Sequence, residues 1–106
     1  MVREISVAEL KARRDRGENP LVLDVREAWE LQLARIPDVV HVPMNQVPAR
    51  LAEFSMDAET IVMCHVGGRS MRVAQFLAGQ GFTNVANLAG GIAAWSETVD
   101  ATVPQY

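Results

Sequence analysis

Cysteine is nearly absent from this sequence, because Cys64 is the only one among 106 residues. A lone cysteine excludes a disulfide within the chain and a metal site built from several cysteines. It is also typical of proteins that work in a reducing compartment. We therefore expect no metal and no cofactor, and any special role of Cys64 must come from chemistry at a single sulfur atom.

Long apolar runs and clustered positive charge are lacking as well. No stretch approaches the roughly twenty apolar residues that a membrane helix needs, and residues 1–6 have no apolar signal-peptide core. The net charge is −3, and the one basic cluster, Lys11 to Arg16, is interpreted as a solvated helix face. The sequence thus predicts a cytoplasmic protein with neither a membrane nor a nucleic acid as its partner.

The rest of the composition is that of an ordinary globular protein. Hydrophobic residues make up 49% and charged residues 22%, which argues against disorder. A length of 106 residues suits one domain with one real core, so we expect a single domain over 1–106.

Apolar runs without alternation predict strands that are buried on both faces, as in a parallel sheet. These runs lie between segments of helical composition, and short turns join the two kinds. The expected strands are 21–25, 39–42, 60–63 and 84–87, and the expected helices are 6–16, 28–33, 45–54, 70–80 and one from 91 onward. This alternation predicts a three-layer α/β/α domain with a mainly parallel sheet of about five strands.

Cys64 follows one of these buried strands and opens the stretch CHVGGRS. Ligands of open parallel sheets bind beyond the carboxyl ends of the strands, which is where Cys64 falls. A glycine-rich turn, the charge of Arg69 and a helix beginning at Ser70 would all favour an anion at this point. The thiolate is such an anion and is the nucleophilic form of cysteine. The alternative interpretation is a structural buried cysteine before a plain glycine turn.

The stretch resembles the active-site loop of the rhodanese-like domain family, in which Cys-x-x-Gly-x-Arg precedes a helix. Three further segments resemble that family in the same order: LVLDVREAWE at 21–30, IPDVVHVPM at 36–44 and NVANLAGGIAAW at 84–95. The resemblance covers nearly the whole chain. It departs at Ala34-Arg35, where the family usually has Gly-His, and at Asp38-Val39, where it usually has Gly-Ala. These departures alter a surface turn near the site more than its chemistry, so the resemblance does not extend to substrate specificity.

The resemblance implies a rhodanese-type sulfurtransferase, which moves a sulfane sulfur from thiosulfate or a persulfide to a thiophilic acceptor. The acceptor would be cyanide, a small thiol or a protein thiol. Cys64 would be the catalytic nucleophile and would carry the sulfur as a persulfide. The loop that binds the persulfide or substrate would be His65, Val66, Gly67, Gly68 and Arg69.

Roles within and around this loop stay open in two cases. Arg69 would either donate to loop and substrate or brace the loop, since its planar fork suits both. His65 is interpreted as contributing only its amide, with donor binding or proton transfer as the alternative. The family further implies a structural anchor at Asp24, while His41 is expected to be structural. We place Trp29 at the pocket mouth and Trp95 in the core.

Two other functions compete with sulfur transfer. Many rhodanese-like domains are non-enzymatic regulatory, binding or sulfur-carrier modules, but these often lack the cysteine that is present here. Related cysteine phosphatases place five residues between cysteine and arginine, whereas four separate Cys64 from Arg69. The shorter loop should suit a sulfur atom and be too small for a phosphoryl group. Because His65 and Val66 supply no second cation beside Cys64, modest thiosulfate activity and better turnover of persulfides are expected.

Overall fold

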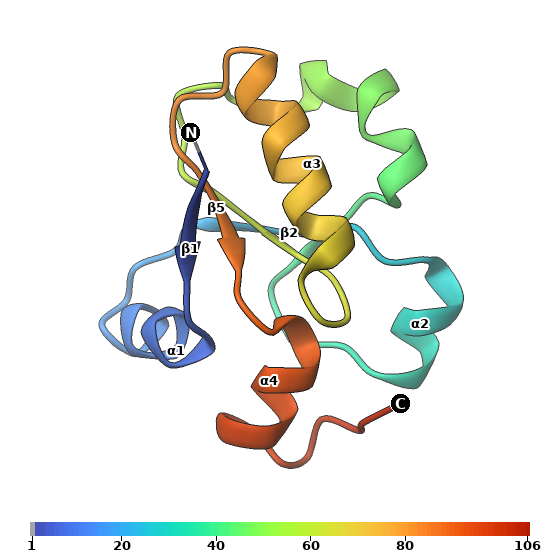
Figure 1. Ribbon diagram of the computed structural model, residues 1–106. Helices are drawn as coiled ribbons and strands as arrows, with labels where there is room; N and C mark the ends of the chain where they lie inside the picture. Colours follow the sequence, from blue (N-terminus) through green and yellow to red (C-terminus); the bar gives the residue numbers. More distant parts are fainter. Residues whose placement is uncertain (1) are drawn as a thin grey trace.

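A central sheet of five strands forms the middle of the molecule in a computed structural model that describes residues 2–106 (Figure 1). All neighbouring strands run parallel, in the order β1-β5-β4-β2-β3. The strands are β1 Arg3–Ile5, β2 Leu21–Asp24, β3 Val40–His41, β4 Thr60–Met63 and β5 Val85–Leu88. The predicted α/β fold with a parallel sheet is therefore confirmed.

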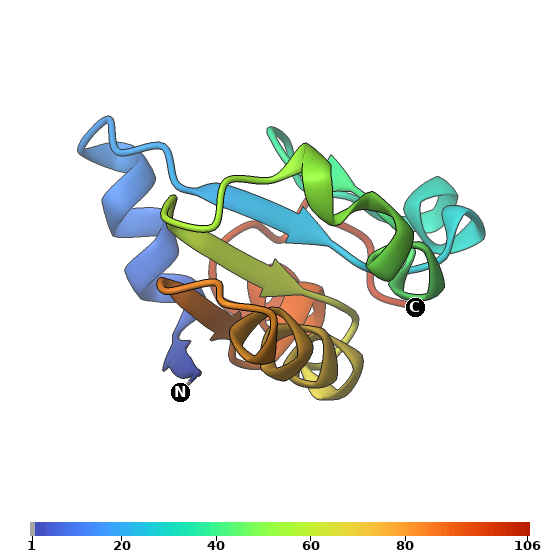
Figure 2. The ribbon, with the colours of Figure 1, turned by 90° about the horizontal axis from the view of Figure 1, so that it is seen from above.

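Helices cover the sheet on two sides, and one short helix lies beyond its carboxyl edge (Figure 2). Helices α1 and α4 contact each other on one face, while α3 packs on β4 and β5 and contacts η1. The helix α2 follows β2 directly. The α-helices are α1 Val7–Asp15, α2 Ala28–Leu33, α3 Gly68–Gly79 and α4 Gly91–Thr98.

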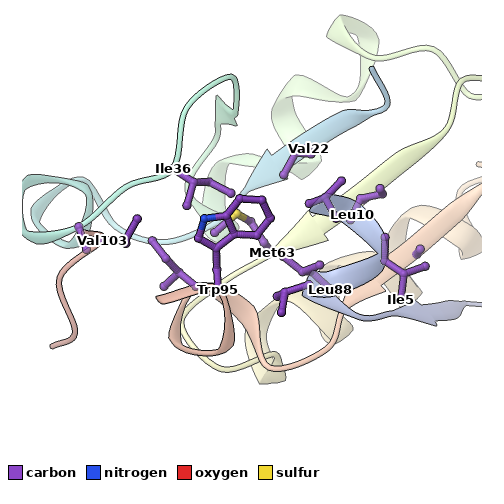
Figure 3. Close-up of a cluster of buried hydrophobic side chains, with 13 residues drawn as sticks. Ile5, Leu10, Val22, Ile36, Met63, Leu88, Trp95 and Val103 are labelled. Carbon is purple, nitrogen blue, oxygen red and sulfur yellow. The ribbon is translucent and has the colours of Figure 1, made fainter. Parts of the chain in front are cut away.

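Both faces of the sheet contribute to a hydrophobic core. One cluster joins Leu10 of α1, Met63 of β4 and Trp95 of α4, and Trp95 is buried as predicted (Figure 3). The other cluster includes Cys64 and the α3 residues Ala74 and Leu77. Burial on both sides explains why the strands read as continuous apolar runs.

The segment 45–54 is not the α-helix that its apolar spacing predicted. It forms two 3₁₀ turns, η1 Met44–Gln46 and η2 Pro48–Glu53, with non-helical dihedral angles at Arg50 (φ −115°, ψ 15°). An α-helix would need an amide hydrogen at Pro48 to bond the carbonyl of Met44, and proline has none. That carbonyl instead accepts from Val47 at 3.3 Å, which is a 3₁₀ bond.

Strand β1 was not among the strands expected from the sequence. It has three residues and pairs only with β5, so its pattern is too short to stand out. Asp38 has φ 60°, which is a conformation that favours glycine, at a position where the family usually has one. Within residues 2–106, no helix combines the length and the apolar character needed to cross a bilayer.

Candidate active site

Strand β4 places Cys64 at the carboxyl edge of the sheet, between the starts of α3 and α4. The residue is 1% exposed. The chain turns at Gly67, which has φ 115° and is the N-cap of α3. A residue with a Cβ atom rarely adopts this conformation, so the glycine permits the tight turn that brings the helix start back to the sulfur.

The Cys64 sulfur lies among hydrogen-bond donors of the loop and of the first turn of α3. The amide of Gly67 donates to Sγ at 3.1 Å and the hydroxyl of Ser70 lies 3.3 Å from it. Burial raises the pKa of the Cys64 thiol, but hydrogen bonds from the Ser70 side chain and from the amides of Ser70, Gly67 and Val66 together outweigh burial and lower this pKa. Donors around the sulfur therefore favour the thiolate even though the site is buried.

Asn87 supports this cradle from β5. It is 3% exposed, and its Oδ1 atom lies 2.5 Å from the Ser70 hydroxyl oxygen. Its Nδ2 atom donates to the carbonyl of Gly67 at 3.3 Å and to Oε2 of Glu4 at 3.4 Å. One side chain thus joins the loop, the first turn of α3 and the edge strand β1.

The start of α4 holds the carbonyl side of the loop. The amide of Ile92 donates to the Cys64 carbonyl and that of Ala93 to the His65 carbonyl, both at 3.0 Å. This approach requires Gly91, since a Cβ atom there would lie 2.4 Å from the Cys64 carbonyl oxygen. The Gly-Gly turn before α4 is therefore part of the site.

Arg69 turns its guanidinium to a carboxylate of α2. Its Nη1 and Nη2 atoms donate to the two oxygens of Glu30 at 2.7 and 2.8 Å. Arg69 is the main reason why the pKa of Glu30 falls to about 2, and the bond from the Tyr106 hydroxyl lowers it further, against the effect of burial. The charge next to the loop is thus largely compensated by a buried carboxylate.

The C-terminal segment closes the site from the side of α2. The Tyr106 hydroxyl donates to Glu30 at 2.8 Å and accepts from Arg26 at 2.9 Å. Its ring stacks on His65 with 4.1 Å between ring centroids and 10° between planes. Trp29 meets the same ring edge-on at 6.4 Å and is 61% exposed. Tyr106 therefore contacts both the ring of His65 and the carboxylate of the Arg69–Glu30 ion pair.

Asp24 and Arg26 form a fully buried ion pair beneath this network. The guanidinium of Arg26 also donates to the Ala34 carbonyl at 2.9 Å. The ring of His41 lies 2.7 Å from the Arg26 carbonyl oxygen, a contact that holds the turn after β2. These contacts are what a structural anchor requires.

The predicted loop residues are close together, although they do not share one task. Gly67 and Val66 direct amides to the sulfur, His65 stacks on Tyr106, and Arg69 pairs with α2. Sequence reasoning named Ser70 only as the start of a helix and missed its hydroxyl, which lies 3.3 Å from Sγ of Cys64. It also missed Glu30, Asn87 and Tyr106. Each acts through a partner at least 17 positions away, so no local spacing marks it. Among residues 2–106, no three His, Cys, Asp or Glu side chains are grouped to hold a metal.

This chain belongs to the rhodanese-like domain family, whose model matches residues 6–98. It is 36% identical over 96 residues to a sulfurtransferase of Allochromatium vinosum, a match that covers 91% of this chain and 90% of that protein. It is 33% identical to the thiosulfate sulfurtransferase GlpE of Pseudomonas savastanoi pv. phaseolicola, with 95% and 94% covered. A crystal structure of a rhodanese-like domain protein from Staphylococcus aureus superposes with a TM-score of 0.86 at 27% identity over 99% of both chains.

Relatives differ in their length beyond the shared region. A chloroplastic protein of Arabidopsis thaliana with rhodanese-like and PpiC domains is 37% identical, and the match covers 99% of this chain but 38% of that protein. The rhodanese-like region therefore occurs both in proteins of this size and inside larger ones.

Proposed function

We propose that the protein is a sulfurtransferase that carries a sulfane sulfur on Cys64 as a persulfide. The sulfur would come from thiosulfate or a persulfide and would pass to cyanide or a thiol. The observation that carries this proposal is the pair of donors on the sulfur, the Gly67 amide and the Ser70 hydroxyl. Such donors stabilise an anion at sulfur, which is the form that attacks.

The first step forms one S–S bond and breaks another. The Cys64 thiolate attacks the outer sulfur of the donor, and the donor's own S–S bond breaks. Its electron pair leaves with sulfite when the donor is thiosulfate, or with a thiolate when the donor is a persulfide. In the second step the acceptor attacks the outer sulfur of the Cys64 persulfide, and the Cys64 thiolate leaves.

The intermediate can be tested by mass spectrometry of the intact protein. After incubation with thiosulfate or a low-molecular-weight persulfide and removal of the donor, we expect a mass gain of one sulfur atom that cyanide removes. Cys64→Ala should show no gain, and Cys64→Ser provides a nearly isosteric control that keeps a polar atom in the buried cradle. Absence of the gain with every donor would contradict the proposal and favour a binding module.

Donor preference follows from the pairing of Arg69. Thiosulfate carries two negative charges, and Glu30 already compensates the cation beside the loop. A persulfide places less charge in the site. We therefore expect a higher kcat/KM for persulfides than for thiosulfate. The difference should be about tenfold or more, because the second charge of thiosulfate lacks a contact with a free cation. Steady-state kinetics with both donors and one common acceptor tests this, and equal values would show that charge compensation does not govern donor choice.

Phosphatase chemistry has weaker support from the same loop. Four residues separate Cys64 from Arg69, and Arg69 is occupied by Glu30 on both of its terminal nitrogens. A phosphoryl group would need that guanidinium to be free. The arrangement favours a small, soft, singly charged species at Cys64.

A further inference from the structure

The hydroxyl of Ser70 faces two acceptors and has one proton to give. Its oxygen lies 2.5 Å from Oδ1 of Asn87 and 3.3 Å from Sγ of Cys64. A serine hydroxyl carries a single hydrogen, so it donates to one of them at a time. Ser70 is 0% exposed, which excludes bulk water as a replacement partner.

The orientation of the Asn87 amide follows from its other neighbours. Nδ2 lies 3.3 Å from the Gly67 carbonyl oxygen and 3.4 Å from a carboxylate oxygen of Glu4, and both of these are acceptors. Turning the amide over would place its own oxygen against two oxygens. Oδ1 therefore faces Ser70 and acts as an acceptor for the hydroxyl proton.

We propose that Asn87 is a positioning residue that competes with Cys64 for the Ser70 proton. While Cys64 is a thiol, the hydroxyl donates to Asn87, and its oxygen is free to accept from the S–H group. When Cys64 becomes a thiolate, the sulfur can only accept, and the hydroxyl turns toward it. Asn87 then loses its donor, so each ionisation breaks the bond from Ser70 to Asn87 and replaces the S–H···O bond by an O–H···S bond.

This competition has a consequence for sulfur transfer, which rests on the proposed function. In the persulfide the negative charge lies on the outer sulfur, and Sγ has two covalent neighbours. The hydroxyl then returns to Asn87, and it turns to Sγ again when the thiolate is released. Asn87 thus limits how strongly the resting thiolate is stabilised, and it couples the state of the sulfur to β5.

Other charged groups face the same sulfur and must be separated from this effect. Arg69 lies close enough that the Cys64 charge helps to raise its pKa, and Glu30 compensates it. His65 adjoins Cys64, and Glu4 lies behind Asn87. The buried Asp24–Arg26 pair lies at the carboxyl end of the neighbouring strand β2, and residues 91–94 at the start of α4 carry no charge.

A double-mutant cycle isolates the competition from these groups. The pH dependence of Cys64 alkylation by iodoacetamide is measured in the wild type, Ser70→Ala, Asn87→Leu and the double variant. The loss of the Gly67 contact affects both variants that carry Asn87→Leu equally and cancels. At pH values below the midpoint of the alkylation profile, we expect Ser70→Ala to slow alkylation both with Asn87 present and with Asn87→Leu. The slowing should be at least about threefold greater with Asn87→Leu. Equal effects in the two backgrounds would overturn the proposal.

A second measurement uses the unmodified protein, in case Asn87→Leu does not fold. The ¹³Cγ resonance of Asn87 is followed by NMR across the ionisation of Cys64. We expect it to shift at the same midpoint as alkylation and to stop shifting in Ser70→Ala. A flat signal, or a shift that persists without the Ser70 hydroxyl, would refute the competition. Neither experiment uses a sulfur donor, so a failure of persulfide formation would be seen separately.

Discussion

The chemistry of single residues at this site depends on how little free charge surrounds the sulfur. Neutral donors from Gly67 and Ser70 reach Sγ, while the guanidinium of Arg69 is held by Glu30. A neutral hydrogen bond in a buried site is strong because no water competes for it. The lowered pKa of Cys64 is therefore assigned to the Ser70 hydroxyl and to backbone amides, which together outweigh burial.

Changing the two members of the ion pair should move the reactivity of Cys64 in opposite directions. Arg69→Ala removes the cation and leaves Glu30 as a nearby anion, so we expect slower alkylation at neutral pH, by less than about tenfold. Glu30→Gln removes the compensating anion and should speed alkylation. Iodoacetamide kinetics at several pH values measure both effects.

The matched control for this pair is Glu53→Gln. Glu53 also pairs with an arginine, Arg50, at 2.8 Å on both contacts, but it lies on the exposed turn η2. Its removal should leave alkylation unchanged. Rates that move in the same direction for Arg69→Ala and Glu30→Gln would indicate that loop disorder, and not charge, controls the thiol.

At the scale of elements, two helices begin at the same sulfur, and each starts with a glycine in a left-handed conformation. Gly67 caps α3 and Gly90 caps α4, with φ 115° and 79°. Amides of Val66, Gly67 and Ser70 at the start of α3 donate to the sulfur, and those of Ile92 and Ala93 in α4 bind the carbonyls of residues 64 and 65. The loop is thus held on both its donor and its acceptor side.

Gly91 is the glycine whose replacement should affect the loop most directly. In Gly91→Ala the new methyl group would meet the carbonyls of Cys64 and His65, and φ 57° is itself unfavourable for alanine. We expect a loss of about 2 kcal/mol or more in the free energy of unfolding, together with lower persulfide formation. Urea unfolding and the mass assay measure the two effects.

Gly79→Ala is the control for that substitution. Gly79 is the last residue of α3, and a Cβ atom there would meet nothing within 4 Å. Alanine at this position should change stability by no more than about 1 kcal/mol, since it favours helix and has room. Similar losses for both variants would show that the contact of Gly91 with the loop is not what makes it special.

The sequence was informative where structure depends on local patterns. The strands 21–25 and 60–63 stood out because both of their faces are buried, and Cys64 with its glycine turn could be placed at a strand end. Segment 45–54 has helical spacing, yet Pro48 divides it into 3₁₀ turns. The spacing of apolar residues carries no information about backbone amides, so it does not reveal that Pro48 lacks the hydrogen an α-helix needs there.

Residues that act over long distances in the chain could not be found in that way. Glu30 and Tyr106 reach the site only through folding, across 39 and 76 positions respectively. Asn87 lies in a buried strand, where a polar side chain indicates some partner without saying which one. The two roles considered for Arg69 also could not be separated, because the carboxylate that binds it lies on α2.

On the scale of the whole molecule, Glu30 connects segments from three parts of the chain. It lies on α2 and accepts hydrogen bonds from both terminal nitrogens of Arg69 on α3. It also accepts one from the hydroxyl of Tyr106 near the C-terminus. The N-cap of its own helix adds a bond from the amide of Glu27 at 2.9 Å. A buried carboxylate with this many donors stabilises the fold only while it is ionised.

The stability of the protein should therefore depend on pH through Glu30. Its pKa is about 2 in the folded protein, against an ordinary value of 4.5. Because the folded pKa is depressed, the stabilisation is complete above about pH 4.5 and is lost as the pH falls toward 2. The difference between the two pKa values corresponds to about 3 kcal/mol at neutral pH.

Glu30→Gln tests this link, since glutamine resembles the protonated carboxyl group in shape and charge. We expect the wild type to be more stable than the variant by about 3 kcal/mol at pH 7. The gap should close between about pH 4.5 and 2, because in this range Glu30 is protonated in the unfolded chain but still ionised in the folded protein. Below about pH 2 both folded proteins present a neutral side chain to Arg69. Urea unfolding at several pH values measures the gap, and the other carboxylates cancel because they are common to both proteins. A gap that stays constant with pH would mean that glutamine disturbs packing, and that the charge of Glu30 does not hold α2, α3 and the C-terminal segment together.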